Sequence, residues 1–167
     1  MGINAIFTVR IYLMVTTHRI SADLYFEDFE LIAVHADVHD FSLAYHLNKT
    51  MGLQLARRKK DLCLQDDIWF ATFEWSDDVN DNYWMLVANH CKTETNNSSI
   101  GLFGQETATV SRHLVEERKE VDYFLKLETE IPGMVDKTLK SLKEIPGVLT
   151  AYGIDTEILK SKKNLIL

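Results

Sequence analysis

Residues 121–154 read VDYFLKLETEIPGMVDKTLKSLKEIPGVLTAYGI, and this stretch indicates the fold class. Over residues 121–128 apolar and polar side chains alternate, which is typical of a strand with one covered face. Pro132 is well placed near the first turn of a helix. The apolar positions of that helix recur at spacings of three and four, at Ile131, Val135, Leu139, Leu142 and Ile145. Pro146 and Gly147 end the helix, and residues 148–154 favour a strand, so a strand, helix and strand unit is predicted.

A second pair of elements is predicted nearer the amino terminus. Residues 31–34 (LIAV) are apolar on both alternating faces, as expected for a strand inside a sheet. Asp40 is expected to be the N-cap of a helix that ends at Gly52. The apolar face of this helix carries Leu43, Ala44, Leu47 and Met51.

The middle of the chain is predicted to be β-rich. Residues 53–64 suggest two short strands around a basic turn, and residues 68–75 and 83–90 suggest a hairpin closed by the polar residues 76–82. Residues 92–105 show no period and are predicted to be a loop. The order of elements predicts an α+β fold, a two-layer sandwich with a mainly antiparallel sheet of five to six strands and two principal helices.

One domain is expected over residues 23–155, with an N-terminal extension at 1–22 and a basic C-terminal tail at 156–167. Residues 1–13 are interpreted either as an overextension of the start site or as an edge strand. The edge-strand interpretation places Phe7, Val9, Ile11 and Leu13 on one face. No signal peptide or membrane span is predicted, because Arg10 interrupts an apolar run that is too short for either.

Charge and cysteine content exclude several classes of protein. The 167 residues carry a formal net charge of −7, from 18 Lys and Arg against 25 Asp and Glu. Such a field repels phosphate backbones, so a nucleic-acid binder is disfavoured. Cys63 and Cys91 have no paired spacing, which favours a reducing, cytoplasmic location and no metal site. Phosphate-binding loops and common catalytic motifs are absent from the sequence, and no cofactor is predicted.

Residues 115–123 read VEERKEVDY. This segment resembles the signature of the IPExxxVDY family of small bacterial proteins found in Bacteroidetes. The matching positions are Glu117, Val121, Asp122 and Tyr123. Glu116 stands where the signature has proline, which frees φ and restores an N–H in the turn before the strand. The likeness covers residues 24–154, and it implies a cytoplasmic protein with no assigned catalytic residue.

The densest cluster of titratable groups is His35, Asp37 and His39, at the junction of the first predicted strand and helix. Strand ends that meet helix starts bind ligands because free N–H groups and the positive end of the helix dipole converge there. A histidine beside a carboxylate also suits acid–base work or metal binding. These residues are the candidate ligand cleft. The favoured interpretation is nevertheless an exposed turn next to a helix cap.

Asp122 and Tyr123 of the signature have a ligand-binding and a structural interpretation. In the first, a carboxylate beside a phenol binds a ligand amine. In the second, Tyr123 is a core residue with its hydroxyl bonded at the periphery, and Asp122 anchors a loop by accepting backbone N–H bonds. The structural interpretation is favoured because buried polar groups are usually satisfied locally.

Three tryptophans, Trp69, Trp75 and Trp84, lie in the predicted hairpin together with other aromatic residues, and form a candidate interaction surface. The sequence therefore favours a non-catalytic protein-interaction or regulatory module, with a protein partner or self-association. The alternative is a ligand-binding protein or enzyme that uses the cleft at His35, Asp37 and His39; its small molecule is not specified by any motif.

Overall fold

The computed structural model describes residues 29–64, 68–96 and 107–166, so the two interpretations of residues 1–13 lie outside the described residues. Its centre is a six-stranded antiparallel sheet in the order β10-β1-β9-β6-β5-β2. The bounds of these strands, in sheet order, are Val148–Ile154, Glu30–Ala36, Tyr123–Glu128, Asn82–Ala88, Thr72–Asp77 and Ala56–Arg57. The predicted α+β class and the antiparallel sheet are confirmed.

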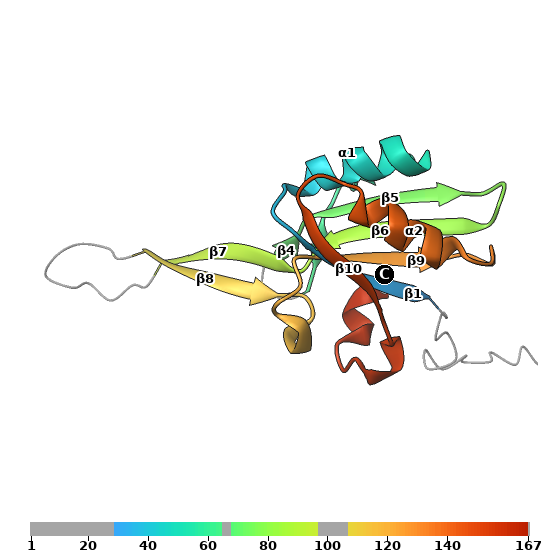
Figure 1. Cartoon of the computed structure of the whole chain (residues 1–167). Helices are drawn as coiled ribbons and strands as arrows, with labels where there is room; N and C mark the ends of the chain where they lie inside the picture. Colours follow the sequence, from blue (N-terminus) through green and yellow to red (C-terminus); the bar gives the residue numbers. More distant parts are fainter. Residues whose placement is uncertain (1–28, 65–67, 97–106, 167) are drawn as a thin grey trace, which may run out of the picture.

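Both helices, α1 (Asp40–Met51) and α2 (Met134–Lys143), cover the same face of this sheet (Figure 1). Leu43 and Leu47 of α1 and Leu142 of α2 are completely buried against it. Gly52 ends α1 in a left-handed conformation, with its N–H bonded to the Asn48 carbonyl, as predicted. Because these apolar stripes were readable as periods of three and four, the helical layer was predictable.

The opposite face of the sheet is also covered. Its apolar residues, including Leu31, Met85 and Phe124, pack against a second set of buried residues that come from outside the main sheet. These are supplied by the small sheet of β3 (Leu62–Cys63) and β4 (Trp69–Phe70), by the segment around Val115, and by the C-terminal residues. The sheet therefore lies between two apolar cores.

The two-sided burial corrects the prediction of a polar face on β9. Lys126 lies on the predicted polar face, yet the residue is only 2% exposed. Its Nζ is 2.6 Å from a carboxylate oxygen of Glu128 and lies over the ring of Phe29, 4.6 Å from the centroid. An alternating pattern indicates a polar face, but a partly buried ion pair and an aromatic contact can cover that face as well.

The C-terminal residues belong to the second core. Two short 3₁₀ turns, Thr156–Ile158 and Lys162–Leu165, follow β10 on the side of the sheet away from the helices (Figure 1). Leu159 and Leu165 are buried there. The part of the chain expected to be a basic tail therefore packs as part of the domain. The lysines of this segment gave no indication of this packing, because the apolar residues between them make the contacts with the second core.

The prediction of a loop over residues 92–105 is wrong for its described part. Residues His90–Asn96 form β7, which pairs with β8 (Thr107–His113) in a ribbon that extends away from the sheet (Figure 1). Asn89 separates β6 from β7, so the predicted strand 83–90 ends two residues early. Threonines in this ribbon have good β propensity but no apolar alternation, which is why the pattern suggested a loop.

The two outer strands of the main sheet differ in length and charge. β2 has two residues, and its neighbourhood is the basic run Arg57 to Lys60. β10 has seven residues, VLTAYGI, with no charged side chain. Short length and lysines are features that discourage edge-to-edge pairing, and β10 has neither. None of the helices in the described ranges is long and apolar enough to cross a membrane.

Candidate functional site

The turn between β1 and α1 is held by backbone bonds to a distant segment. Asp37 donates its N–H to the Gly147 carbonyl at 2.9 Å. The helix begins at Asp40 itself, and His39 occupies the N-cap position without a side-chain bond. The expectation that Asp40 caps the helix is therefore wrong by one residue. Its carboxylate instead accepts the N–H of Phe41 at 2.7 Å within the first turn, where a negative charge suits the helix dipole.

His35, Asp37 and His39 do not converge on one point. The His35 ring stacks on Tyr152, and its Nε2 is 3.3 Å from the Tyr152 hydroxyl. Ile32, Val34 and Ala36 of β1 face the helices, so His35 projects from the other face of the sheet. Asp37 and His39 are exposed, and His39 stacks on Phe41 with ring centroids 5.4 Å apart. The spacing of the sequence alone did not show that alternation along β1 separates His35 from the other two.

A pocket of about 460 Å³ lies beside this turn, and is called the turn pocket below. Its lining residues are Ala36, Asp37, Val38, His39, His90, Asp122 and Tyr123. His90 was not among the predicted cleft residues, because the sequence placed it at the end of the predicted strand 83–90, and only the fold brings it beside the turn after β1. Within the described ranges, no group of three or more His, Cys, Asp or Glu side chains is placed to hold a metal ion.

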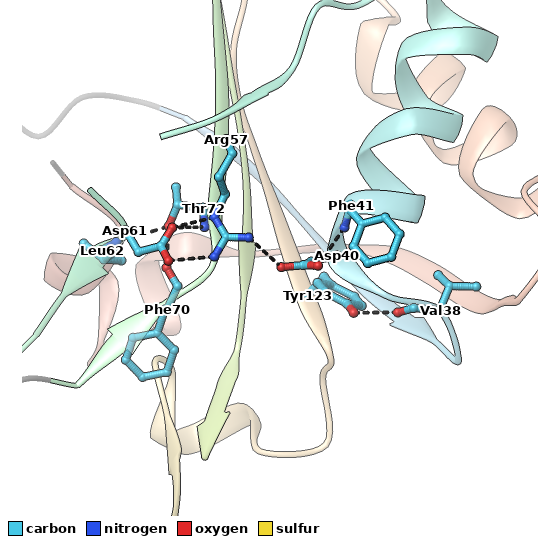
Figure 2. Close-up of polar contacts among 9 residues, drawn as sticks. All are labelled: Val38, Asp40, Phe41, Arg57, Asp61, Leu62, Phe70, Thr72 and Tyr123. Atoms are coloured by element: carbon cyan, nitrogen blue, oxygen red, sulfur yellow. Dashed lines mark hydrogen bonds and ion pairs between the residues drawn. The ribbon is translucent and has the colours of Figure 1, made fainter. Parts of the chain in front are cut away.

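Asp122 and Tyr123 are both engaged in holding the turn. Asp122 Oδ2 accepts the backbone N–H of Ala36 at 2.9 Å. The Tyr123 hydroxyl donates to the Val38 carbonyl at 2.6 Å (Figure 2). Burial, reinforced by the charges of Asp40 and Asp122, raises the pKa of Tyr123 to about 12, so the phenol keeps the proton that it donates. The contacts expected from the structural interpretation are thus present.

Glu117, the first matched residue of the signature, holds the C-terminal segment. One carboxylate oxygen accepts the N–H of Ser161 at 2.7 Å, and the other accepts the Ser161 hydroxyl at 2.6 Å. Val121 is 1% exposed and packs in the second core. Each signature residue therefore joins segments that are distant in the sequence.

Arg57, in the outer strand β2, links the start of α1 to the residue before β3. Its guanidinium makes two 2.7 Å bonds to Asp61 and one 3.0 Å bond to Asp40 (Figure 2). The hydrogen bond from Arg57 is the largest cause of a lowered pKa at Asp61, whose Oδ1 also accepts the Thr72 N–H. Arg58 also makes an ion pair, with Glu74 at 3.2 Å, so two residues of the predicted basic turn have structural roles.

Asn89 is a buried polar residue that the sequence did not single out. Its side-chain Nδ2 donates to the carbonyls of Arg118 and Val121 at 2.7 and 2.9 Å, and its Oδ1 accepts the Val115 N–H at 2.9 Å. The residue is 0% exposed. An asparagine between two strands usually suggests a turn, so only the structure shows that this one organises the whole segment before β9.

The three tryptophans do not share a surface. Trp84 is 2% exposed and packs in the helical core, and Trp75 lies directly opposite it, partly buried in the same core. Trp69 is in β4 and is 45% exposed. The candidate interaction surface is corrected accordingly: of the three, only Trp69 presents a large exposed ring, because the alternation of β5 and β6 directs the others towards the helices.

Exposed apolar side chains occur elsewhere. Phe41 and Tyr45 lie one turn apart on the outer side of α1, with exposures of 62% and 60%. Leu149, in β10, is 75% exposed. It lies next to a register irregularity between β1 and β10, at His35 and Ala36. The Leu149 side chain is thus placed outside the regular ladder, at the outer strand of the sheet.

Comparison of the chain with protein-family models, with curated proteins and with solved structures found no match.

Proposed function

We propose that this protein is a non-catalytic interaction module that pairs with a second copy of itself along the outer side of β10, called the β10 edge below. The observation that carries the proposal is the contrast between the two outer strands. β2 is short and flanked by basic residues, whereas β10 presents seven uncharged residues, including the exposed Leu149. Among the described residues no strand pairs with the outer side of β10, and a long uncharged edge is a template for pairing with another strand.

A second copy is the occupant that the chemistry of β10 favours. In a two-fold antiparallel pairing the residue on the axis meets its own equivalent, and every other residue meets the one equally far on the other side of the axis. Charges on the strand would therefore be brought together with like charges on the second copy. Val148–Ile154 carries none. Pairing would satisfy the outward backbone groups of both strands and remove both Leu149 side chains from water.

The roles of the signature residues also support a non-catalytic function. Asp122, Tyr123 and Glu117 are engaged in holding the turn after β1 and the C-terminal segment. A motif of this kind would mark a shared architecture rather than a shared reaction. Membership of the IPExxxVDY family, and the cytoplasmic location that it implies, are proposed on the same residues.

The test is the mass in solution of the whole chain and of Leu149→Lys, measured by sedimentation over a wide concentration range. We expect a dimer for the natural sequence and a monomer for the variant, because each copy would bring a charged, strongly hydrated side chain to an interface that otherwise has no charge. Val79→Lys is the matched control, since Val79 is 92% exposed at the tip of the β5–β6 hairpin and gains the same charge. Its dimer should persist.

Two outcomes contradict the proposal. One is a monomer for the natural sequence at every concentration. The other is a dimer that Leu149→Lys leaves intact, which would place the interface elsewhere, with the exposed pair Phe41 and Tyr45 on α1 as the next surface to test.

A second candidate function is ligand binding in the turn pocket. The observation in its favour is that His39 and His90 line one pocket together with Asp37, although they come from different elements. His39→Ala and His90→Ala are both at exposed positions and should leave the fold intact. If a metabolite mixture raises the melting temperature of the natural chain but of neither variant, this function replaces the first. Equal shifts, or none, leave it without support.

A further inference from the structure

Gly153 is the only glycine within a strand of the described residues, and it lies in the outer strand β10. A glycine inside a strand weakens that strand, because its backbone loses more freedom on folding and it has no side chain to pack against its neighbours. A glycine at such a position often marks a bulge, a sharp bend, or the close approach of a ligand or of another backbone.

The described part of the chain does not itself require a glycine at position 153. The φ angle of Gly153 is outside the left-handed region. The residue pairs with Ile32 of β1 in regular register, away from the irregularity of these two strands at His35 and Ala36. A Cβ added to Gly153 would meet no atom of the described residues within 4 Å. Open space therefore lies beside Gly153, and close approach from outside the chain is the remaining explanation for the glycine.

Leu149 lies on the same face of β10 and has the opposite character. Side chains alternate along a strand, so Leu149, Ala151 and Gly153 share one face. This is the face of the helical core, in which Ala151 packs. Leu149 has no partner in the register of β1 and β10, and its side chain is largely exposed. One face of the outer strand therefore carries a projecting leucine four residues before an empty position.

The length of β10 determines the register of a two-fold antiparallel pairing. The axis passes through a residue, because directly opposite side chains lie on the same face of the sheet. An axis at Ala151, the middle residue of Val148–Ile154, is the one that pairs all seven residues of the strand. In this register Leu149 of each copy lies directly opposite Gly153 of the other.

We infer that the open space at Gly153 receives the Leu149 side chain of a second copy, with Ala151 on the two-fold axis. The inference rests on the self-association proposed above and specifies which residues meet. Opposite positions of an antiparallel pair have their Cβ atoms about 4.5–5.5 Å apart, so the leucine packs over the bare backbone of the glycine. On the other face, the same register places Thr150 opposite Tyr152, a favourable pair of a β-branched and an aromatic side chain.

The test exchanges the two side chains and measures the dissociation constant of the dimer by sedimentation of the whole chain. Gly153→Leu fills the space that receives Leu149, so it should raise the dissociation constant at least about tenfold. Leu149→Gly leaves that space empty and should also weaken the dimer. The double variant Leu149→Gly/Gly153→Leu again has one large and one small residue in each opposite pair. It should therefore dimerise more tightly than either single variant.

Ala56→Leu is the matched control, because it adds a leucine side chain at an exposed position of the other outer strand, β2. Its dissociation constant should equal that of the natural chain. Folding of Gly153→Leu is checked by its melting temperature at a concentration at which both chains are monomers. It should melt no lower than the natural chain, because the added side chain has space and raises the β propensity of the strand.

Failure of this inference can be told from failure of the proposed function. A natural chain that is a monomer at every concentration, or a dimer that Leu149→Lys leaves intact, overturns both. A natural dimer that Leu149→Lys dissociates, but that Gly153→Leu leaves as tight as before, shows that β10 pairs in another register and overturns the inference alone. A double variant that is no tighter than the two single variants has the same meaning, because positions 149 and 153 are then not opposite each other.

Discussion

Asp122 and Ala36 are 86 residues apart in the sequence, and the carboxylate of Asp122 accepts the backbone N–H of Ala36 at 2.9 Å. The Asp122 N–H in turn donates to the Val34 carbonyl at 3.2 Å. The residue therefore extends the β1–β9 pairing beyond the last regular pair and closes the end of β1. Asp122 of the signature motif therefore helps to hold the turn after β1.

The first prediction is that Asp122→Ala lowers the free energy of unfolding by about 1–3 kcal/mol, because the N–H of Ala36 loses a charged acceptor. Asp122→Asn keeps an oxygen at the same place and should cost less. Urea denaturation measures both. Asp37→Ala is the control, since this neighbouring carboxylate is exposed. An unchanged unfolding midpoint for Asp122→Ala would show that the bond contributes nothing and would return Asp122 to the list of ligand-binding candidates.

The second prediction concerns Glu117 and pH. Burial raises the pKa of Glu117, but the hydrogen bonds from Ser161 lower it by more than burial raises it. The pKa of Glu117 therefore lies below its ordinary value. A carboxylate with a lowered folded-state pKa contributes stability above its unfolded pKa and loses that contribution as pH falls through the folded pKa. Glu117→Gln should therefore be less stable than the natural chain at pH 7. The difference should be smaller at about pH 3 than at pH 7, because pH 3 lies below the ordinary pKa of Glu and the contribution is lost as pH approaches the lowered folded-state pKa.

The measurement is thermal unfolding of the two chains at both pH values. Glu120→Gln is the control, because Glu120 is exposed and its nearest basic nitrogen is 3.7 Å away, at Arg118. A stability difference for Glu117→Gln that stays constant from neutral to acid pH would mean that the charge of Glu117 has no part in holding Ser161.

The third prediction compares two glycines with positive φ, Gly147 at 87° and Gly133 at 75°. A side chain at Gly133 meets no atom within 4 Å, so Gly133→Ala has only the cost of the left-handed backbone, about 1 kcal/mol. A side chain at Gly147 overlaps Val38 in the turn after β1, so Gly147→Ala should cost at least about 1–3 kcal/mol more, by analogy with overpacking. Urea denaturation gives both values.

Val38→Ala tests the reason for this difference. In the double variant the overlap is removed, so Gly147→Ala should cost no more in the Val38→Ala background than Gly133→Ala does in the natural chain. Equal costs for the two single variants would mean that the turn relaxes freely and that contact with Val38 does not restrict Gly147.

The sequence predicted the elements that a local pattern defines and missed those that depend on contacts between distant segments. The helices were readable from local periods, as at Leu43, Leu47 and Leu142, and Gly52 ended α1 as expected. Lys126 was misjudged because its burial depends on Phe29 and on an ion pair, which no alternating pattern shows. The ribbon of β7 and β8 was missed because pairing between distant segments, rather than a local period, defines it.

The candidate site was predictable to a smaller extent. The contacts made by Asp122 and Tyr123 follow from their place at the start of a core strand. His90 and Asn89 had no signal, because each matters only through what the fold brings beside it. His35 was grouped with Asp37 and His39 by proximity in the sequence, although the alternation of β1 directs it to the opposite face, next to Tyr152.

The last prediction concerns Asn89, whose side chain makes three hydrogen bonds to backbone groups of the segment before β9. Asn89→Asp keeps the oxygen that accepts from Val115 but places a second carboxylate oxygen against the carbonyls of Arg118 and Val121. At neutral pH the loss should be at least about 2–4 kcal/mol, because two acceptors lose their donor and a charge is buried. Protonation restores one donor, so burial and the two carbonyls should raise the folded-state pKa of the new carboxyl.

A raised folded-state pKa means that stability relative to the natural chain is best below the unfolded pKa and falls as pH rises through the folded pKa. The deficit of Asn89→Asp should therefore be smallest in acid and largest at neutral pH, the opposite of the behaviour expected at Glu117. Thermal unfolding from pH 4 to pH 8 measures it, with Gln54→Glu on an exposed residue after α1 as the control. A deficit that does not change with pH would mean that water reaches position 89, and that the asparagine does not hold this segment by donating to its carbonyls.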